Sequence, residues 1–139
     1  MKTLIVEDDR TSRLLLIKLL TPYGAVHAAA NGKEAVEAVR VSLETGEKYE
    51  LICLDIMMPE MDGQTALKRI RDMEACYGCV PSTAAKILMT TALNDMTNVA
   101  GAYKSLCDAY LVKPIDKAKL LLELRKLGLA AAASTAGTF

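Results

Sequence analysis

Five short apolar runs alternate along this chain with five segments in which apolar residues recur every three or four positions. The runs predict buried strands, and the periodic segments predict amphipathic helices. Strands that are apolar throughout and joined by helices are typical of a parallel sheet covered on both faces. The sequence therefore predicts an α/β fold with a doubly wound parallel sheet. The expected strands are 3–6, 25–29, 51–54, 86–91 and 109–112, and the expected helices are about 13–20, 32–45, 64–73, 94–105 and 116–127.

The helix boundaries carry local signals. Thr11 or Ser12 is the expected N-cap of the first helix, because hydroxyl side chains accept hydrogen bonds from free amides at a helix start. In the third helix the apolar stripe predicts that Lys68, Arg69 and Arg71 lie mostly outside.

Length and charge limit the function classes. The 139 residues, 52% of them hydrophobic, suffice for one core and are too few for two ordinary domains. Residues 1–127 are expected to form that domain, and 128–139, rich in Ala, Ser, Thr and Gly, a flexible C-terminal tail. Seventeen basic and seventeen acidic residues cancel, which argues against nucleic-acid binding. Since no signal peptide or membrane span is recognisable, a cytoplasmic protein is expected.

The four cysteines are expected to be reduced thiols in that compartment: Cys53, Cys76, Cys79 and Cys107. Cys76 and Cys79 have C-x-x-C spacing, but they follow a helix, whereas a thioredoxin-like redox pair precedes one. A zinc site would need a second pair.

Acidic residues follow two of the predicted strands. Asp55 ends the third strand, and Glu7, Asp8 and Asp9 follow the first. In a doubly wound sheet these strands are neighbours where the strand order reverses, so their carboxylates should converge. Clustered carboxylates repel one another unless a cation joins them. Mg²⁺, or Mn²⁺ in its place, is the expected cation, because both prefer oxygen ligands.

Two further polar residues follow parallel strands at the same edge. Thr91 ends the fourth strand, and Lys113 follows the fifth. A metal, an ammonium and a hydroxyl around a strand-end carboxylate suit phosphoryl transfer, which depends on positioning and charge stabilisation. Asp55 is the predicted phosphoryl acceptor.

In these features the sequence resembles the receiver domain of bacterial two-component response regulators, in particular stand-alone, chemotaxis-regulator-like receivers. The resemblance covers residues 2 to about 127. It rests on four motifs, each at a strand end: Val6-Glu7-Asp8-Asp9, Asp55-Ile56-Met57-Met58-Pro59 with Met61-Asp62-Gly63, Met89-Thr90-Thr91-Ala92, and Tyr110-Leu111-Val112-Lys113-Pro114.

The resemblance implies a flavodoxin-like (βα)5 sandwich with a five-stranded parallel sheet in the order 2-1-3-4-5. It also implies that Asp55 becomes the 4-aspartylphosphate and that Asp8 binds the metal directly. Glu7 would act on the metal through water, while Asp9 lies one place too far along.

Further roles follow from the same resemblance. The backbone carbonyl of Met57 would be a metal ligand, and Lys113 would pair with the phosphoryl oxygens. Thr91 would be the switch hydroxyl and Tyr110 the switch aromatic residue. A cis bond is expected before Pro114.

The implied function is a phosphoacceptor that assists its own phosphorylation and dephosphorylation and is not an enzyme. Its expected partners are a sensor histidine kinase or histidine phosphotransfer protein and a downstream effector, with no nucleic acid or membrane. The surface of the fourth helix, fifth strand and fifth helix would switch, and it would support a monomer or a weak dimer. Phosphorelay intermediate and phosphorylation-independent binding module remain alternatives.

Other α/β phosphate chemistries fit less well. An aspartate-based phosphatase usually has a second Asp two residues after the first, where this chain has Met57. A flavin-binding module would need a phosphate loop after the first strand, where Glu7, Asp8 and Asp9 would repel the phosphate. One departure from receivers is Leu106-Cys107, where the family commonly has Gly-Ala, so this turn must avoid positive φ or accept strain.

Overall fold

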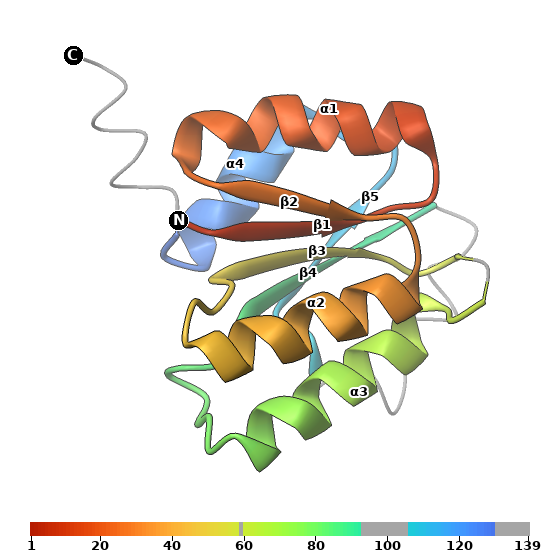
Figure 1. Cartoon of the computed structure of the whole chain (residues 1–139). Coiled ribbons are helices and arrows are strands. Elements are labelled where there is room, and N and C mark those ends of the chain that lie inside the picture. The colour runs from red at the N-terminus through yellow and green to blue at the C-terminus, as the bar shows by residue number, and fades with distance from the viewer. Residues whose placement is uncertain (59, 93–105, 130–139) are drawn as a thin grey trace.

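The computed structural model describes residues 1–58, 60–92 and 106–129. A parallel sheet lies between two layers of helices (Figure 1). The strands are β1 (Thr3–Val6), β2 (Val26–Ala29), β3 (Leu51–Asp55), β4 (Lys86–Thr91) and β5 (Ala109–Val112). The helices are α1 (Arg10–Leu20), the 3-10 turn η1 (Thr21–Tyr23), α2 (Gly32–Thr45), α3 (Gly63–Cys76) and α4 (Lys117–Lys126).

The sheet confirms the expected topology. Its strand order is β2-β1-β3-β4-β5, and every neighbouring pair is parallel. At the carboxyl ends Val6 pairs with Leu54, and Asp55 pairs with Thr90. The residues that follow these strands are therefore brought to one edge of the sheet.

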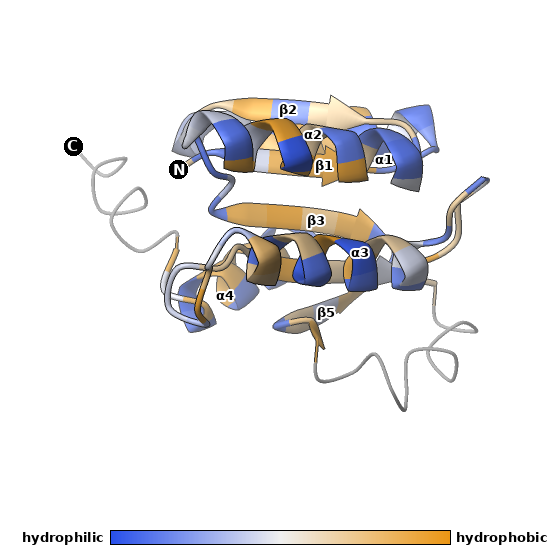
Figure 2. Ribbon diagram, turned by 60° about the horizontal axis from the view of Figure 1, so that its bottom comes forward, coloured by the Kyte–Doolittle hydropathy of each residue, from blue (hydrophilic) through white to orange (hydrophobic). Residues whose placement is uncertain are grey.

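Two hydrophobic cores explain why the strands are apolar throughout. Successive side chains of a strand point to opposite faces. In β3, Ile52 and Leu54 join the core under α2 and α3, while Leu51 and Cys53 join the core under α1 and α4. The central strand is accordingly hydrophobic from Leu51 to Leu54, ahead of Asp55 (Figure 2). Both faces must be apolar, which is the pattern that the sequence carries.

Helix caps correct one prediction. The first helix begins at Arg10, and its N-cap is Asp9, whose side chain accepts from the Ser12 amide at 2.9 Å. The expected cap at Thr11 or Ser12 is therefore wrong. An aspartate caps a helix as well as a serine does, and the acidic run supplies one at position 9.

The third helix corrects a second prediction. Arg71 does not lie mostly outside, since its side chain is only 18% exposed. Its guanidinium joins Glu74 at 2.7 Å and Asp108 at 2.9 Å, and donates to the carbonyls of Leu106 and Ala85, both at 2.8 Å. These residues, Arg71, Glu74 and Asp108, form the amino-edge cluster at the starts of β4 and β5.

Two expected segments fall on undescribed residues. The helix predicted at 94–105 lies outside the described residues, and so does the tail from 130 onward. Of the described part, Leu129 still packs on the core under α1 and α4. The Leu106–Cys107 turn avoids positive φ, which among the described non-glycine residues is found at Glu60.

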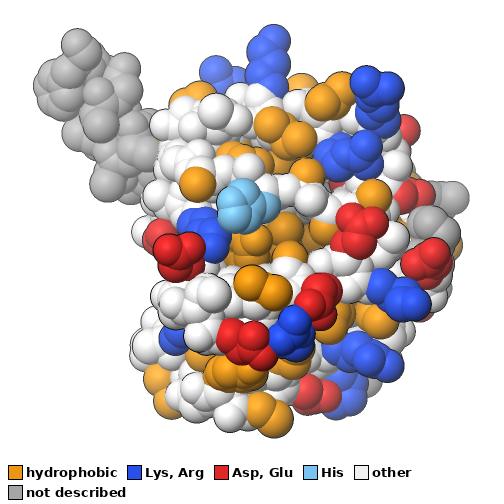
Figure 3. Space-filling view, viewed as in Figure 1, with side chains coloured by type: hydrophobic (Ala, Val, Ile, Leu, Met, Phe, Trp, Pro, Cys, Tyr) orange, Lys and Arg blue, Asp and Glu red, His pale blue; other side chains and the backbone are white. Residues whose placement is uncertain are grey.

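The surface agrees with the balanced charge. On the face shown in Figure 3, basic and acidic side chains are interspersed. The four cysteines, all within the described part of the chain, form no disulfide, and Cys76 is exposed at the end of α3. Among the described residues, no helix combines the length and the apolar character needed to cross a membrane.

Candidate functional site

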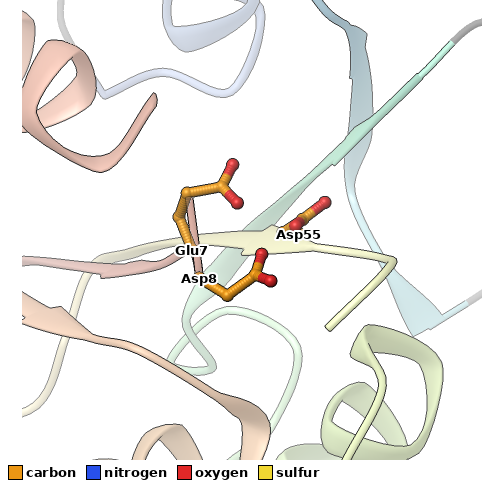
Figure 4. A group of neighbouring side chains, drawn as sticks. All are labelled: Glu7, Asp8 and Asp55. Atoms are coloured by element: carbon orange, nitrogen blue, oxygen red, sulfur yellow. The ribbon is translucent and has the colours of Figure 1, made fainter. Parts of the chain in front are cut away.

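Three carboxylates meet at the carboxyl edge of the sheet. Glu7 and Asp8 follow β1, and Asp55 is the last residue of β3. One carboxylate oxygen from each of the three lies within 4.8 Å of the others. Figure 4 shows the three side chains close together at this edge. Glu7 and Asp55 are buried, at 0% and 4% exposure, whereas Asp8 is exposed. Two charged groups are therefore held out of water beside a third that faces it.

An ammonium group lies against two of these carboxylates. Lys113 follows β5, and its Nζ is 2.6 Å from Glu7 Oε1 and 3.3 Å from Asp55 Oδ1. The Lys113 amide donates to the Thr91 carbonyl at 2.7 Å, which anchors this backbone beside β4. The Lys113–Pro114 bond is cis, as expected. Glu7, Asp8, Asp55 and Lys113 together are called the carboxyl-edge cluster below.

The cluster perturbs the acid strength of its members. Burial raises the pKa of Asp55 to about 7, and hydrogen bonding to Glu7 and the negative charge of Glu7 act in the same direction. The Lys113 ammonium opposes this rise. Burial lowers the pKa of Lys113, but its bond to Glu7 and the two carboxylate charges outweigh burial and leave it raised. One ammonium does not relieve the repulsion among three carboxylates.

The loop after Asp55 is closed tightly. The Gly63 amide donates to the Ile56 carbonyl at 2.8 Å, and the Ile56 amide donates to the Thr90 carbonyl at 3.1 Å. A Cβ atom on Gly63 would lie 2.2 Å from the Asp55 carbonyl oxygen, so only glycine fits there. Met57 lies in this loop with its side chain 57% exposed.

The two predicted switch residues lie on β4 and β5, Thr91 at the end of its strand and Tyr110 one residue after the start of its strand. Thr91 is 1% exposed, and its hydroxyl donates to the Ala92 carbonyl at 3.1 Å. The hydroxyl oxygen of Tyr110 is buried, and its ring packs on the core under α2 and α3. Burial raises the pKa of Tyr110, and the Cys107 thiol acts in the same direction.

Sequence reasoning missed one residue of this region. Arg13, in the first turns of α1, donates through Nη1 to the Glu7 carbonyl at 2.9 Å and reaches the Asp8 carbonyl at 3.5 Å. Its signal in the sequence is weak, because an arginine at this point of a helix is ordinarily a surface residue. Asp9, by contrast, points away to cap α1.

The carboxyl-edge cluster suits a hard divalent cation. Carboxylate oxygens are the ligands that Mg²⁺ and Mn²⁺ prefer, and Asp8 leaves one side of the cluster accessible. A hollow of about 640 Å³ lies between α2 and β2 and includes His27 and Tyr49. His27 there bonds the Tyr49 hydroxyl at 2.7 Å, and none of the three converging carboxylates lines this hollow.

Comparison with known protein families identifies the family to which the chain belongs. The model of the response regulator receiver domain matches residues 3–125. The chain belongs to this family. The receiver domain is a signalling phosphoacceptor module that is generally not classed as an enzyme.

Sequence relatives agree with this assignment to the receiver family. The receiver domain is 34% identical over 125 residues to the transcriptional regulatory protein SrrA of Staphylococcus aureus, covering 89% of this chain and 46% of that protein. The chain thus spans about half the length of the curated relatives that it matches.

Two solved structures resemble the receiver domain. One is the CheX–CheY complex with BeF3 and Mg²⁺ from Borrelia burgdorferi, with 27% identity, a TM-score of 0.74, and coverage of 91% of this chain and 88% of that one. The other is the response regulator TrrA of Thermotoga maritima with Mg²⁺ and BeF, with 26% identity, a TM-score of 0.70, and coverage of 91% and 97%.

Proposed function

We propose that this receiver domain accepts a phosphoryl group on Asp55 in an Mg²⁺-dependent reaction. The observation that carries the proposal is the buried Asp55 carboxylate, held 3.3 Å from the Lys113 ammonium and within 4.8 Å of Glu7 and Asp8. A structural ion pair would not need two further carboxylates of the same sign at this distance. Mg²⁺-containing structures of similar receivers support the choice of metal.

The residues divide the work of binding the metal and the phosphoryl group. Asp8, Asp55 and the Met57 carbonyl would hold Mg²⁺ directly, and Glu7 would hold it through water. When bound, Mg²⁺ supplies positive charge that neutralises the carboxylates and the phosphoryl oxygens. Lys113 pairs with a phosphoryl oxygen, and its bonds to Glu7 and Asp55 already hold its ammonium at the acceptor.

The donor is a phosphohistidine of a sensor histidine kinase or of a histidine phosphotransfer protein. A carboxylate oxygen of Asp55 attacks phosphorus, the bond from phosphorus to the histidine nitrogen breaks, and that nitrogen keeps the electron pair and takes up a proton. Thr91, whose hydroxyl lies at the end of β4, donates to the new phosphoryl oxygens. The domain thereby assists its own phosphorylation and its later hydrolysis.

The signal leaves through a second protein. As Thr91 moves toward the phosphoryl group, Tyr110 fills the space behind it, and the surface that includes β5 and α4 changes. The fourth helix expected at this surface falls on 94–105, outside the described residues. An effector protein reads that surface, alone or with the domain as a weak dimer. We assign residues 1–127 to the receiver unit, although Leu129 just beyond it still packs on the core, and we assign the protein to the cytoplasm.

The test is the intact mass of the protein after incubation with acetyl phosphate and Mg²⁺. We expect a gain of one phosphoryl group that is lost with EDTA and in Asp55→Asn. Asp72→Asn is the matched control, because Asp72 is an exposed aspartate whose ion pair with Lys68 lies on the surface of α3. A folded wild-type protein that gains no mass from this donor or from a phosphorylated kinase would contradict the proposal and favour a phosphorylation-independent binding module.

A further inference from the structure

Arg13 reaches back from α1 to the turn that carries two of the acidic residues. Its Nη1 donates to the Glu7 carbonyl oxygen at 2.9 Å in a partly buried contact, and it also reaches the Asp8 carbonyl oxygen at 3.5 Å. One guanidinium nitrogen is thus shared by two consecutive carbonyls. Hydrogen bonds from a charged donor are stronger than neutral ones.

The other bonds of this turn hold different groups. The Glu7 amide donates to the Ala29 carbonyl at 3.1 Å, and the Asp9 amide donates to Glu7 Oε2 at 3.3 Å. Asp9 itself is fixed as the N-cap of α1. The amides of the turn are therefore held by the sheet and by Glu7, while its carbonyls face Arg13.

This contact has a mechanical consequence at the carboxyl-edge cluster. The carboxylates of Glu7, Asp8 and Asp55 repel one another, and the turn after β1 is the part of the cluster that can yield by rotating its peptides. Rotation about the N–Cα bond of a residue moves its side chain and its carbonyl together. A donor that holds the Glu7 carbonyl at 2.9 Å and contacts the Asp8 carbonyl at 3.5 Å therefore also restrains the directions of the Glu7 and Asp8 side chains.

We propose that Arg13 is a positioning residue for the divalent cation, holding the Glu7–Asp8 turn so that its carboxylates stay converged toward Asp55. This inference rests on the Mg²⁺ site of the proposed function. Groups that orient metal ligands without touching the metal commonly contribute 10- to 100-fold to metal affinity.

Because Arg13 is positively charged, the direction of the change in Mg²⁺ affinity on its removal tests the inference. A cation near a metal site repels the metal, so by charge alone the loss of Arg13 would tighten Mg²⁺ binding. Loss of a positioning contact would weaken it. Arg10 supplies a matched control, because it is an exposed arginine in the same first turn of α1.

The experiment is a calorimetric titration of Mg²⁺ into the metal-free protein at low ionic strength, with wild type, Arg13→Met, Arg13→Lys and Arg10→Met. Methionine keeps the length of the arginine stem and removes its donors, and lysine keeps the charge with a single donor group. We expect the Kd to rise about tenfold in Arg13→Met and about threefold in Arg13→Lys. Arg10→Met should bind Mg²⁺ as tightly as wild type or more tightly.

Urea unfolding of the same metal-free variants separates positioning from stability. A Kd in Arg13→Met equal to or below that of wild type would overturn the inference, even if the variant is less stable. Should Arg13→Met not fold, the same criterion applies to Arg13→Lys. A wild-type protein that binds no Mg²⁺ would overturn the proposed metal site together with this inference, whereas unchanged variants of a metal-binding wild type would overturn the inference alone.

Discussion

The two edges of the sheet hold clusters of similar composition that are satisfied to very different degrees. At the amino edge, the Arg71 guanidinium bonds two carboxylates and two backbone carbonyls. Each of those carboxylates also accepts from a backbone amide: Glu74 from Ala85 at 2.7 Å, and Asp108 from Ile87 at 2.8 Å. Every charge there has partners of opposite polarity.

At the carboxyl edge the balance is different. One ammonium serves Glu7 and Asp55, and Asp8 adds a third carboxylate within the same 4.8 Å. Burial and Glu7 raise the pKa of Asp55 to about 7, which records the cost of ionising it without a metal. The difference teaches that burial of charge alone does not mark a functional site. A functional site is indicated when buried groups of the same charge lack enough partners of opposite charge. A cation can supply the missing charge, and a phosphoryl donor can react with the carboxylate.

Breaking the amino-edge cluster should have the largest effect on stability. Arg71→Met leaves the Glu74 carboxylate, only 4% exposed, without its cation, and it also removes two bonds to backbone carbonyls. We expect the free energy of unfolding, measured in urea, to fall by about 3–5 kcal/mol. Phosphoryl uptake per folded molecule should be unchanged at low temperature; a selective loss of uptake would mean that the two edges are coupled.

The same substitution should have opposite signs at the two edges. Asp108→Asn weakens the contacts with Arg71 and should lower the free energy of unfolding by about 1–3 kcal/mol. Asp55→Asn removes a carboxylate that repels Glu7 and should raise it by about 1–3 kcal/mol at pH 8 without metal. Urea unfolding of both variants checks this, and equal signs would contradict the contrast between the clusters.

The pH dependence of Asp55→Asn follows from the raised pKa. Because folded Asp55 holds its proton up to about pH 7 and the unfolded chain loses it near 3.8, this carboxyl favours folding at low pH. That contribution is complete below pH 4 and is lost as the pH rises through 7. The advantage of Asp55→Asn over wild type should therefore be small near pH 4 and complete near pH 8, and an advantage independent of pH would refute the assignment to ionisation.

The smallest expected effect is the stabilisation of the protein by Mg²⁺, and it should depend on the carboxyl edge alone. Mg²⁺ at ten times its Kd should raise the free energy of unfolding of the wild type by about 1.4 kcal/mol, since it binds the folded state. Thermal unfolding with and without Mg²⁺ measures this. Asp108→Asn should keep the full increment and Asp55→Asn should lose most of it; equal increments in the two variants would place the metal away from the carboxyl edge.

The strands and their polar ends could be predicted because their signals are local. Each strand is a continuous apolar run, and the residues that end β1 and β3 meet because adjacent parallel strands finish at one edge. The convergence of Glu7, Asp8 and Asp55 therefore needed only the strand order. The expected helix at 94–105 lies outside the described residues, and the roles of Thr91 and Tyr110 stay predictions.

The misses involve partners far apart in the sequence. Arg71 contacts Asp108, which is 37 positions away in the sequence. Helical periodicity reports only neighbours within the helix, so it could not predict that the Arg71 side chain is largely buried. The cap at Asp9 was missed because the hydroxyl residues Thr11 and Ser12 were preferred as caps, although an aspartate accepts the same hydrogen bonds. Arg13 donates to backbone carbonyls, and a sequence does not show which carbonyls a turn leaves accessible to such a donor.

The close contact between Gly63 and the end of β3 limits which substitutions this sequence can accept. A side chain at 63 would collide with the Asp55 carbonyl, whereas Gly46 and Gly78 have open space and only need a residue that tolerates positive φ. Asparagine can substitute at the latter two positions, but no residue can replace glycine at 63 without displacing the peptide that carries Asp55. Divergence of the loop between 56 and 62 is therefore constrained at one point, where Gly63 approaches the backbone of Asp55.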